Sequence, residues 1–338
     1  MKDYLTNRFQ IVQVKNTKSN KRFVNCGVPQ GTVLGPLLFN LYINDLFDLD
    51  IDGDIISFAD DTAIFFRDKT WDALKRKCER ELQIIYHYFQ EKILTINISK
   101  TNYVPFTSLA SSLPEFEELT LNTECDCKGI RIQGVNKIKY LGVYLDSHLR
   151  WDVHVSYVTG KVRWLSGKFK KLREIFTAGQ LRTLYFALIQ SHITYGVAVW
   201  GGASSNHLDQ LEKAQKYVIK IMYDKNYLYP TDQLFDECKL FDVRQLFCFA
   251  VLKKQHYSKK DKVKNIRETR NNVAQILVPR PTKTSTQRSF YYLAPKIYNI
   301  LPFDIRNINS EQLFKKKLKL WIESKSRSFI TCLVTNKT

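Results

Sequence analysis

The sequence has no uninterrupted hydrophobic stretch of membrane-spanning length. Residues 184–203 are the most apolar long segment, but four polar residues interrupt it: Gln190, Ser191, His192 and Thr194. Such side chains are unfavourable at the centre of a bilayer, so we predict a buried helix here and no membrane partner. A tight turn at the paired glycines 201–202 should follow this helix.

Cysteine is scarce, and its spacing shows no framework. Seven cysteines, an odd number, are scattered through 338 residues, which indicates free thiols in a reducing compartment. Cys125 and Cys127 form a C-x-C pair, but a zinc site needs more ligands than this segment offers. A signal peptide is also missing, since Met1 leads directly into "KDYLTNRFQ". We therefore expect an intracellular protein of the nucleus, the cytoplasm or both.

Acidic residues are outnumbered by basic ones. Lys and Arg total 52 against 33 Asp and Glu, which gives a formal net charge of +19. This excess suggests a polyanionic partner, either nucleic acid or an anionic membrane surface. Aromatic residues make up 13% of the chain, and single-stranded nucleic acid binds surfaces that are both basic and aromatic. A merely soluble basic protein is the alternative at this point.

The first 148 residues alternate helix and strand patterns, which indicates an α/β or α+β unit. Residues 9–24 alternate apolar and polar around a polar "NTKSN" turn, as in a hairpin. A strongly apolar helix is expected over 37–46, beginning just after Pro36. Residues 71–93 have a helical period with one apolar stripe. Two further strand regions are expected at 94–106 and 138–146.

From Leu149 onward the pattern is helical. Residues 155–176 place apolar side chains on one face and mostly Lys and Arg on the other, and more helices follow to about residue 222. The segment 253–270 is very basic and weakly periodic, which indicates a linker or mobile arm. Apolar periodicity returns over 291–324, so this part should dock. We predict an α+β fold in three parts: residues 1–148, an all-α domain over 149–225 and a helical region over 226–338.

Residues 55–66 read "IISFADDTAIFF", which predicts a buried hairpin with Asp60 and Asp61 at its bend. Unit charges about 4 Å apart repel by roughly 4 kcal/mol at an effective dielectric near 20. Two buried carboxylates this close therefore need a proton or a cation between them. An exposed Asp-Asp turn is the plain alternative. The matching strands on both sides favour a rigid platform for a hard cation such as Mg²⁺, which takes carboxylate and phosphate oxygens.

The "FADD" tetrapeptide resembles the F/Y-x-D-D signature of reverse transcriptases. Preceded by "GVPQGTVLGPLLFNLYINDL" at 27–46, it resembles the polymerase of non-LTR (LINE-type, jockey-like) retrotransposons. "INISKT" at 96–101 and "KYLGVYLD" at 139–146 follow in the family's order. "SHITYGVAVWG" and "LAPKIYNILP" resemble its downstream segments. The resemblance covers nearly the whole chain, and implies a partial polymerase palm over 1–148 followed by a thumb-like domain over 149–225.

The resemblance also implies roles for single residues. The catalytic, metal-binding carboxylates are Asp60 and Asp61, with Mg²⁺ as the cofactor and Mn²⁺ as its alternative. The residues implied at the nucleotide and template are Gln30, Gly31, Phe58 and Lys100. A primer grip is implied at Leu141 and Gly142, and thumb contacts to nucleic acid at Lys161, Lys168 and Lys171. Structural alternatives are a surface lysine at 100, a plain strand at 141–142 and a solvated helix face at 161–171.

Other parts of the family's pattern are not found in this sequence. A third palm carboxylate is implied in a segment resembling "FDxxxAFD", a few dozen residues before "YLTNRFQ", whereas this sequence begins three residues before Tyr4. The fingers, the N-terminal endonuclease domain and the cysteine–histidine knuckle of some relatives are likewise not found. We therefore expect a truncated copy or partial gene product that is inactive by itself, because metals held by two carboxylates are poorly positioned.

Two functions of different classes follow from these patterns. The first is an RNA-directed DNA polymerase, with an RNA template, a DNA primer and dNTPs as partners. The second is a catalytically dead remnant that still binds nucleic acid through its basic helix. A product without any role, which aggregates through uncovered sheet edges, is a third. Primer extension and salt-dependent binding distinguish the first two.

Overall fold

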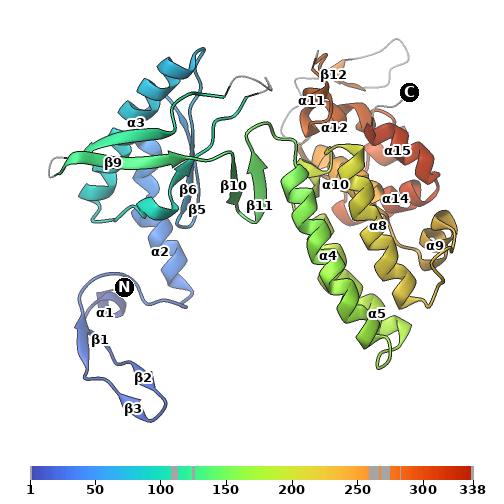
Figure 1. Ribbon diagram of the computed structural model, residues 1–338, viewed down its shortest axis with the longest axis horizontal. Coiled ribbons are helices and arrows are strands. Elements are labelled where there is room, and N and C mark those ends of the chain that lie inside the picture. The colour runs from blue at the N-terminus through green and yellow to red at the C-terminus, as the bar shows by residue number, and fades with distance from the viewer. Residues whose placement is uncertain are drawn as a thin grey trace. The chain divides into compact units, whose positions relative to one another are not determined.

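The computed structural model describes residues 2–107, 113–123, 126–258, 266–267, 275–281 and 283–335. Two compact units make up the chain (Figure 1). One comprises Met1–Tyr103 with Pro114–Val135, and the other comprises Val104–Leu113 with Asn136–Thr338. The compact units therefore divide near residue 135 and not at 148, and the helices on either side of residue 225 share one core. The division into palm and thumb stays a prediction.

The N-terminal strands form two nested hairpin ladders, as the alternation over 9–24 predicts. After α1 (Lys2–Leu5), β1 (Arg8–Gln10) pairs antiparallel with β4 (Arg22–Val24), and β2 (Gln13–Val14) pairs with β3 (Thr17–Lys18). Because Val14 faces Thr17, the turn falls at Lys15 and Asn16, a little earlier than the "NTKSN" segment suggests. Lys15 adopts a φ of 54° there, a backbone region common in tight hairpin turns.

The apolar helix of the "GVPQG" block begins earlier than predicted. Helix α2 runs over Leu34–Tyr42, so Pro36 is its third residue and not the residue before it. The first four N–H groups of a helix have no intrahelical partner, and a proline within that turn therefore costs no hydrogen bond. The helix also ends earlier, and a 3₁₀ turn, η1 (Asn44–Asp48), follows it.

Helix α3 (Trp71–Glu91) is the common support of the first unit. On one side it packs against η1 and the hairpin of β5 (Asp54–Phe58) and β6 (Asp61–Phe65), where Leu46, Ile85 and Tyr88 form a buried cluster. On another side, Leu82 and Tyr86 contact a second cluster built from the three-stranded sheet. Thr70 caps the helix by accepting from the backbone N–H of Ala73.

The three-stranded sheet contains strands that the sequence patterns do not predict. Its order is β7 (Asn102–Tyr103), β9 (Asp126–Gly134) and β8 (Glu118–Thr123), with β7 parallel and β8 antiparallel to β9. The predicted strand region 94–106 is mostly the 3₁₀ turn η2 (Ile98–Lys100) followed by this two-residue strand. In the described ranges, the strands form one three-stranded and five two-stranded sheets. The antiparallel palm sheet implied by the resemblance is therefore divided into short ladders.

The second unit is a hairpin followed by helices. Its hairpin pairs β10 (Lys137–Tyr140) with β11 (Val143–Asp146), and confirms the strands predicted over 138–146. The longest helices, α4 (Asp152–Leu172) and α8 (Ser205–Met222), lie side by side (Figure 1). The later helices are α9 (Thr231–Cys238), α10 (Val243–Ser258), α11 (Thr284–Gln287), α12 (Phe290–Tyr298), α13 (Phe303–Arg306), α14 (Glu311–Glu323) and α15 (Arg327–Thr335). A short ladder pairs β12 (Ile266–Arg267) with β13 (Gln275–Ile276).

The sequence patterns of this unit are largely confirmed. Val162, Leu165 and Phe169 are buried on the inner face of α4, and the helices after residue 290 contribute to the same core. The predicted basic linker begins inside α10, and most of it lies outside the described residues, as does the side chain of Cys127 with all of Cys125. The five cysteines that are described are free: Cys26, Cys78, Cys238, Cys248 and Cys332.

The apolar segment 184–203 is buried but divided. It comprises the end of α5 (Ala178–Leu184), a π-helical turn η3 (Tyr185–Gln190), α6 (Ser191–Thr194) and α7 (Val197–Trp200). Gly196 interrupts the helix with a φ of 64°. Trp200 is fully buried in the core, and the predicted turn follows at Gly201. Among the described helices, none is both long and apolar enough to span a bilayer.

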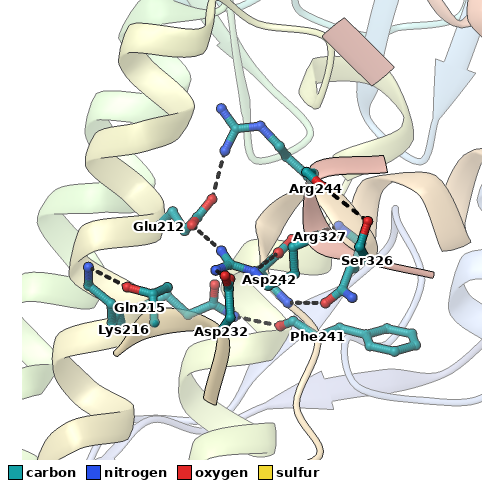
Figure 2. Close-up of polar contacts among 12 residues, drawn as sticks. Glu212, Gln215, Lys216, Asp232, Phe241, Asp242, Arg244, Ser326 and Arg327 are labelled. Atoms are coloured by element: carbon teal, nitrogen blue, oxygen red, sulfur yellow. Dashed lines mark hydrogen bonds and ion pairs between the residues drawn. The ribbon is translucent and has the colours of Figure 1, made fainter. Parts of the chain in front are cut away.

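An ion network closes the second unit by binding α15 to α8, α9 and the start of α10 (Figure 2). Arg327 donates through Nε to Asp242 and through Nη1 to Asp232, each at 2.7 Å. Its Nη2 donates to Glu212, whose other oxygen accepts from Arg244 at 2.6 Å. The side chain of Asp242 is 2% exposed. A charge this buried is tolerated only with a partner, so Arg327 holds the last helix in place.

Replacing Arg327 with methionine should lower the free energy of unfolding of the second unit by about 3–5 kcal/mol, because Asp242 and Glu212 remain buried without this cation. Urea denaturation followed by tryptophan fluorescence measures the loss, since four of the five tryptophans belong to this unit: Trp151, Trp164, Trp200 and Trp321. The control is Arg173→Met, which removes an exposed pair with Asp224 and should cost less than about 1 kcal/mol. Equal losses in the two variants would contradict the prediction.

Candidate polymerase site and nucleic-acid surface

The two adjacent carboxylates lie at a two-residue hairpin bend. Phe58 pairs with Asp61 across the β5–β6 ladder, so Ala59 and Asp60 form the connection. Ala59 has a φ of 55°, a conformation that L-residues other than Asn and Asp adopt with strain. The bend therefore places Asp60 in the loop and Asp61 at the first position of β6. The sequence pattern predicts this juxtaposition, and the structure confirms it.

The predicted burial of this hairpin is wrong. Ile55 and Ile64 face the cluster on α3, but Ile56 is 52% and Phe58 is 65% exposed. Side chains alternate between the two faces of a strand, and here only one face is covered. The apolar residues on both sides of the bend therefore do not indicate that both faces of the hairpin are buried. Asp60 and Asp61 are themselves exposed, so water screens their repulsion.

The chemistry of this bend suits a hard cation. The side-chain carboxylates of Asp60 and Asp61 form no hydrogen bond or ion pair with another described residue, so both have their acceptor positions available. No group of three or more His, Cys, Asp or Glu residues that could hold a metal occurs in the described part of the chain. A divalent ion at the bend would therefore need further oxygen ligands, and phosphates commonly supply them.

Gln30 and Gly31 lie in a shaped loop before α2. Gly31 has a φ of 77°, which favours glycine, and no described atom lies within 4 Å of the position that a Cβ would take. Thr32 holds the turn, since its hydroxyl donates to the carbonyl of Pro29 at 2.9 Å. Arg8 ties the loop to β1 by donating to the carbonyl of Gly27 at 2.6 Å. The loop therefore leaves an open, backbone-accessible surface at residues 30–31.

The helix after this loop is fixed to the end of α3. Tyr88 donates its hydroxyl to Asp45 at 2.6 Å, and Lys92 forms an ion pair with Asp45 at 2.5 Å. Tyr42 donates to the carbonyl of Lys92 at 2.6 Å. The hydrogen bonds from Lys92 and Tyr88 lower the pKa of Asp45. These contacts position the "GVPQG" block relative to α3, and α3 also supports the carboxylate hairpin.

Lys100 is an exposed residue at the end of η2. Its carbonyl accepts from the side chain of Asn102 at 3.3 Å, while no hydrogen bond or ion pair of its ammonium group connects it to Asp60 or Gln30. Within the described residues, the structure joins Phe58, Asp60 and Asp61 at one bend. Among the described residues, no hydrogen bond or ion pair joins Lys100 or Gln30 to this bend.

The predicted primer grip is the turn of the β10–β11 hairpin. Leu141 and Gly142 form its connection, with φ angles of 44° and 81°, so both residues have the positive φ that tight two-residue hairpins use. Tyr195 donates its hydroxyl to the carbonyl of Leu141 at 2.6 Å, and a Cβ on Gly142 would meet the ring of Tyr195 at 3.2 Å. Gly142 is therefore required both by the turn and by the packing of Tyr195.

A histidine holds the other side of this hairpin. The backbone N–H of Tyr144 in β11 donates to Nδ1 of His154 at 3.3 Å, and His154 is only 2% exposed beside Trp200. Burial lowers the pKa of His154 to about 4. The imidazole is therefore neutral near pH 7 and can accept this hydrogen bond. Protonation would remove the acceptor and leave a buried charge.

The predicted thumb lysines lie on the exposed side of α4. Lys161, Lys168 and Lys171 are exposed, as the helical period predicts. Aromatic rings accompany them: Lys168 lies 5.3 Å from the ring centre of Trp164, and Lys161 lies 5.7 Å from that of Tyr157. Trp164 is 64% exposed. The helix therefore presents both cations and aromatic faces to solvent.

Two residues of these surfaces are missed by sequence reasoning. Tyr195 lies in the quoted "SHITYGVAVWG" segment, but only the fold brings it to the Leu141 turn. Trp164 has a signal in the sequence, because it follows Lys161 by three residues and precedes Lys168 by four, which places all three on one helical face.

Comparison with known proteins identifies the class to which these surfaces belong. Residues 1–145 match the family described as reverse transcriptase (RNA-dependent DNA polymerase). This match contains the carboxylate bend, the Gln30 loop, Lys100 and the Leu141 turn. The first part of the chain is therefore similar to reverse transcriptase domains.

The curated relatives narrow this class. A probable RNA-directed DNA polymerase from transposon X-element of Drosophila melanogaster is 28% identical over 264 residues, which cover 72% of this chain and 26% of the relative. A second, from transposon BS of the same species, is 25% identical and covers 72% and 27%. The RNA-directed DNA polymerase from mobile element jockey, also of that species, is 26% identical and covers 65% and 24%. The predicted resemblance to LINE-type reverse transcriptases is confirmed.

These matches have a limited extent. The chain spans about a quarter of the length of the curated relatives that it matches. No solved structure matches the chain.

The second unit should lose stability as the pH falls from about 6.5 to 4. The unfolded His154 binds a proton near pH 6.5, whereas the folded one does so near pH 4. Its contribution to stability is therefore complete above about pH 6.5 and is lost on acidification. Urea midpoints measured across this range should vary less in His154→Gln, which keeps an acceptor but does not titrate. The exposed His192→Asn is the matched control, and an unchanged pH profile in His154→Gln would refute the assignment.

Proposed function

We propose that this chain carries a polymerase site of an RNA-directed DNA polymerase. In this reaction the 3′-hydroxyl of a DNA primer attacks the α-phosphorus of a dNTP, an oxygen–phosphorus bond forms, and pyrophosphate leaves. The observation that carries the proposal is the exposed Asp60–Asp61 bend within a region similar to reverse transcriptase domains. Its carboxylates are adjacent, unpaired in the described residues and supported by α3.

Asp60 and Asp61 would hold the divalent metal, for which we propose Mg²⁺ with Mn²⁺ as a substitute. Their oxygen ligands are of the hard type that these ions prefer, and the triphosphate would complete the coordination. When bound, the metal neutralises phosphate charge and so lowers the barrier to phosphoryl transfer. The strained Ala59 connection would fix the two carboxylates relative to each other, since strain of this kind persists only where the surrounding fold imposes it.

The other residues of the first unit would place the nucleotide. The open backbone at Gly31 and the exposed amide of Gln30 would lie against the base pair, because no side chain blocks approach there. The exposed ring of Phe58 precedes the carboxylates and would contact the nucleotide or template. Lys100 would neutralise triphosphate charge and donate a proton to the leaving pyrophosphate.

The second unit would hold the template and primer. The Leu141–Gly142 turn, with Tyr195 as its support, would contact the primer backbone near its 3′ end. The cations of α4 would follow the phosphates of the duplex, and Trp164 would add an apolar contact. Phosphate contacts of this kind position a protein on a duplex without reading its sequence.

A second candidate function is nucleic-acid binding without catalysis. It is favoured by the observation that the described residues offer two carboxylates and no third ligand at the bend. The basic and aromatic face of α4 does not depend on those carboxylates, and it could bind a duplex alone. Primer extension separates this function from polymerisation.

Asp60→Asn should abolish primer extension on an RNA template, since the amide keeps the shape of the side chain but removes its charge and most of its affinity for a divalent ion. The assay uses the purified chain with template, primer, dNTPs and Mg²⁺, and Asp54→Asn on the same hairpin serves as the control. Mn²⁺ binding, followed by electron paramagnetic resonance with template, primer and dNTP present, should fall in the same variant.

The two candidate functions give different outcomes in this experiment. Extension by the wild-type chain that disappears in Asp60→Asn supports the polymerase. Tight duplex binding without extension or Mn²⁺ uptake in the wild-type chain would refute it, and would support the binding protein instead.

The three lysines of α4 should contribute to duplex affinity through phosphate contacts. Replacing Lys161, Lys168 and Lys171 together with glutamine should reduce the slope of log affinity against log salt by about 2.7, or about 0.9 for each lost contact. Fluorescence anisotropy with a labelled duplex at several KCl concentrations measures this slope. The matched control replaces Lys316, Lys317 and Lys319 of α14, which are also exposed. Equal slopes in the two triple variants would show that only net charge matters.

A further inference from the structure

A cavity of about 780 Å³ lies within the second unit, away from the residues to which any function has yet been given. Three loops meet there: residues 147–152 between β11 and α4, residues 199–207 around the start of α8, and residues 286–291 at the start of α12. Its volume is in the range of pockets that enclose small organic ligands. The question is which ligand its walls suit.

The walls are well defined. The carboxylate of Asp146 accepts from three loop N–H groups, those of His148 at 3.1 Å, Arg150 at 3.0 Å and Trp151 at 2.9 Å. These bonds hold a loop in which Trp151 has a φ of 66°. A Cβ on Gly202 would come within 1.9 Å of the carbonyl of Arg288, so two of the loops pack backbone against backbone. The cavity therefore exists without a ligand to shape it.

The charged side chains of the lining are mainly cationic. Arg150 and Arg288 come from different loops, and both are exposed. Over the ranges that the structure covers, neither guanidinium forms a hydrogen bond or an ion pair. The lining contains one carboxylate, Asp152, which accepts from the N–H of Val153 at 2.9 Å. Both guanidinium groups are therefore available, and their planar arrangement of N–H donors suits the oxygens of a phosphate.

Aromatic side chains form a second part of the lining. Trp151, Phe290 and Tyr291 line the cavity, and Phe106 completes it from the segment before β8. Tyr291 is 69% and Phe106 is 40% exposed, so both rings are accessible. A purely apolar ligand would leave the two guanidinium groups desolvated without partners, which is costly. A small inorganic anion would make no contact with the aromatic rings. A ligand with both an aromatic ring and a phosphate satisfies both parts.

We propose that this cavity binds a nucleotide of single-stranded nucleic acid, with its phosphate at Arg150 and Arg288 and its base against the aromatic lining. Bases within a duplex are stacked on one another, so a concave site can reach only bases that are unstacked. This site goes beyond the proposed polymerase function. It does not depend on Asp60, on a metal or on primer extension.

The test measures binding of short fluorescein-labelled oligouridylate and oligothymidylate to the full chain by anisotropy, at several KCl concentrations and without metal. Arg150→Gln combined with Arg288→Gln should reduce the salt slope by about 1.4, or about 0.7 for each single-strand phosphate contact. Tyr291→Ala should weaken binding by on the order of tenfold and leave the slope unchanged, because it removes stacking but no charge. Comparing the affinities of the oligouridylate and the oligothymidylate shows whether the cavity prefers RNA or DNA.

The control for charge is Lys316→Gln combined with Lys317→Gln, which should leave single-strand binding unchanged. Uridine monophosphate should compete with the oligonucleotide, whereas equimolar inorganic phosphate should not. Equal effects of the arginine and lysine variants, or no effect of Tyr291→Ala, would overturn the proposal. Because all these positions are exposed, the variants should retain the cooperative melt of the parent chain, which circular dichroism checks.

A second measurement uses the unmodified chain. Photocrosslinking with an oligonucleotide that contains 4-thiouridine should label the peptides that carry Trp151 or Tyr291, and excess unlabelled oligonucleotide should suppress this labelling. Labelling confined to other peptides would also overturn the proposal. The Asp60→Asn variant should be labelled at the same peptides as the wild-type chain. The crosslinking result therefore does not depend on whether the polymerase proposal is correct.

Discussion

The helical unit depends on the pairing of buried carboxylates with Arg327. Asp242 is almost fully enclosed, and Glu212 is mostly enclosed, where an isolated negative charge is unfavourable. Burial raises the pKa of Glu212, and the nearby Asp242 raises it further, while Arg327 and Arg244 act in the opposite direction. The network therefore balances acids against two arginines that come from distant parts of the sequence. Arg244 already links α10 to Glu212 of α8, and the docking of α15 through Arg327 adds Asp232 of α9 to this link (Figure 2).

The first unit is organised around a single helix. The residues of α3 face two clusters, one under the carboxylate hairpin and one under the three-stranded sheet. The same helix receives Asp45 and Tyr42 at its C-terminal end, and so anchors the segment that follows the Gln30 loop. The loop and the bend are each tied to one rigid element, although they are far apart in sequence. Sites supported in this way are positioned more accurately than sites held by loops alone.

The local features of the chain were accessible from its sequence. The Asp60–Asp61 bend and the face of α4 follow from short-range patterns, because two-residue turns and helical periods are local. The start of α2 was misplaced at Pro36, since a proline is equally compatible with several positions of a first turn. Strands β8 and β9 were missed although Leu119 and Leu121, and Ile130 and Ile132, alternate with polar residues, because each alternation is short. A bulge also interrupts their ladder near Leu121.

Properties that depend on tertiary packing could not be predicted. The apolar residues Ile56 and Phe58 gave no sign of which strand face would be covered. The hairpin at 137–146 belongs by contact to the helical unit, although its strands resemble those before it. The cavity beside Arg150 and Arg288 is formed by three loops, of which the first and the last are more than a hundred residues apart in sequence, and no local pattern marks such a meeting.

The π-helical turn over Tyr185–Gln190 has a consequence for the Leu141 turn. This wide turn accommodates one residue more than an α-helix would, and it lies just before the short helix that leads to Tyr195. If the same residues wound as a regular α-helix instead, the helical phase of everything after them would change by about 100°. The hydroxyl of Tyr195 would then point away from the carbonyl that it now holds. A change of helix winding in this apolar segment would thereby release a turn some fifty residues earlier in the chain.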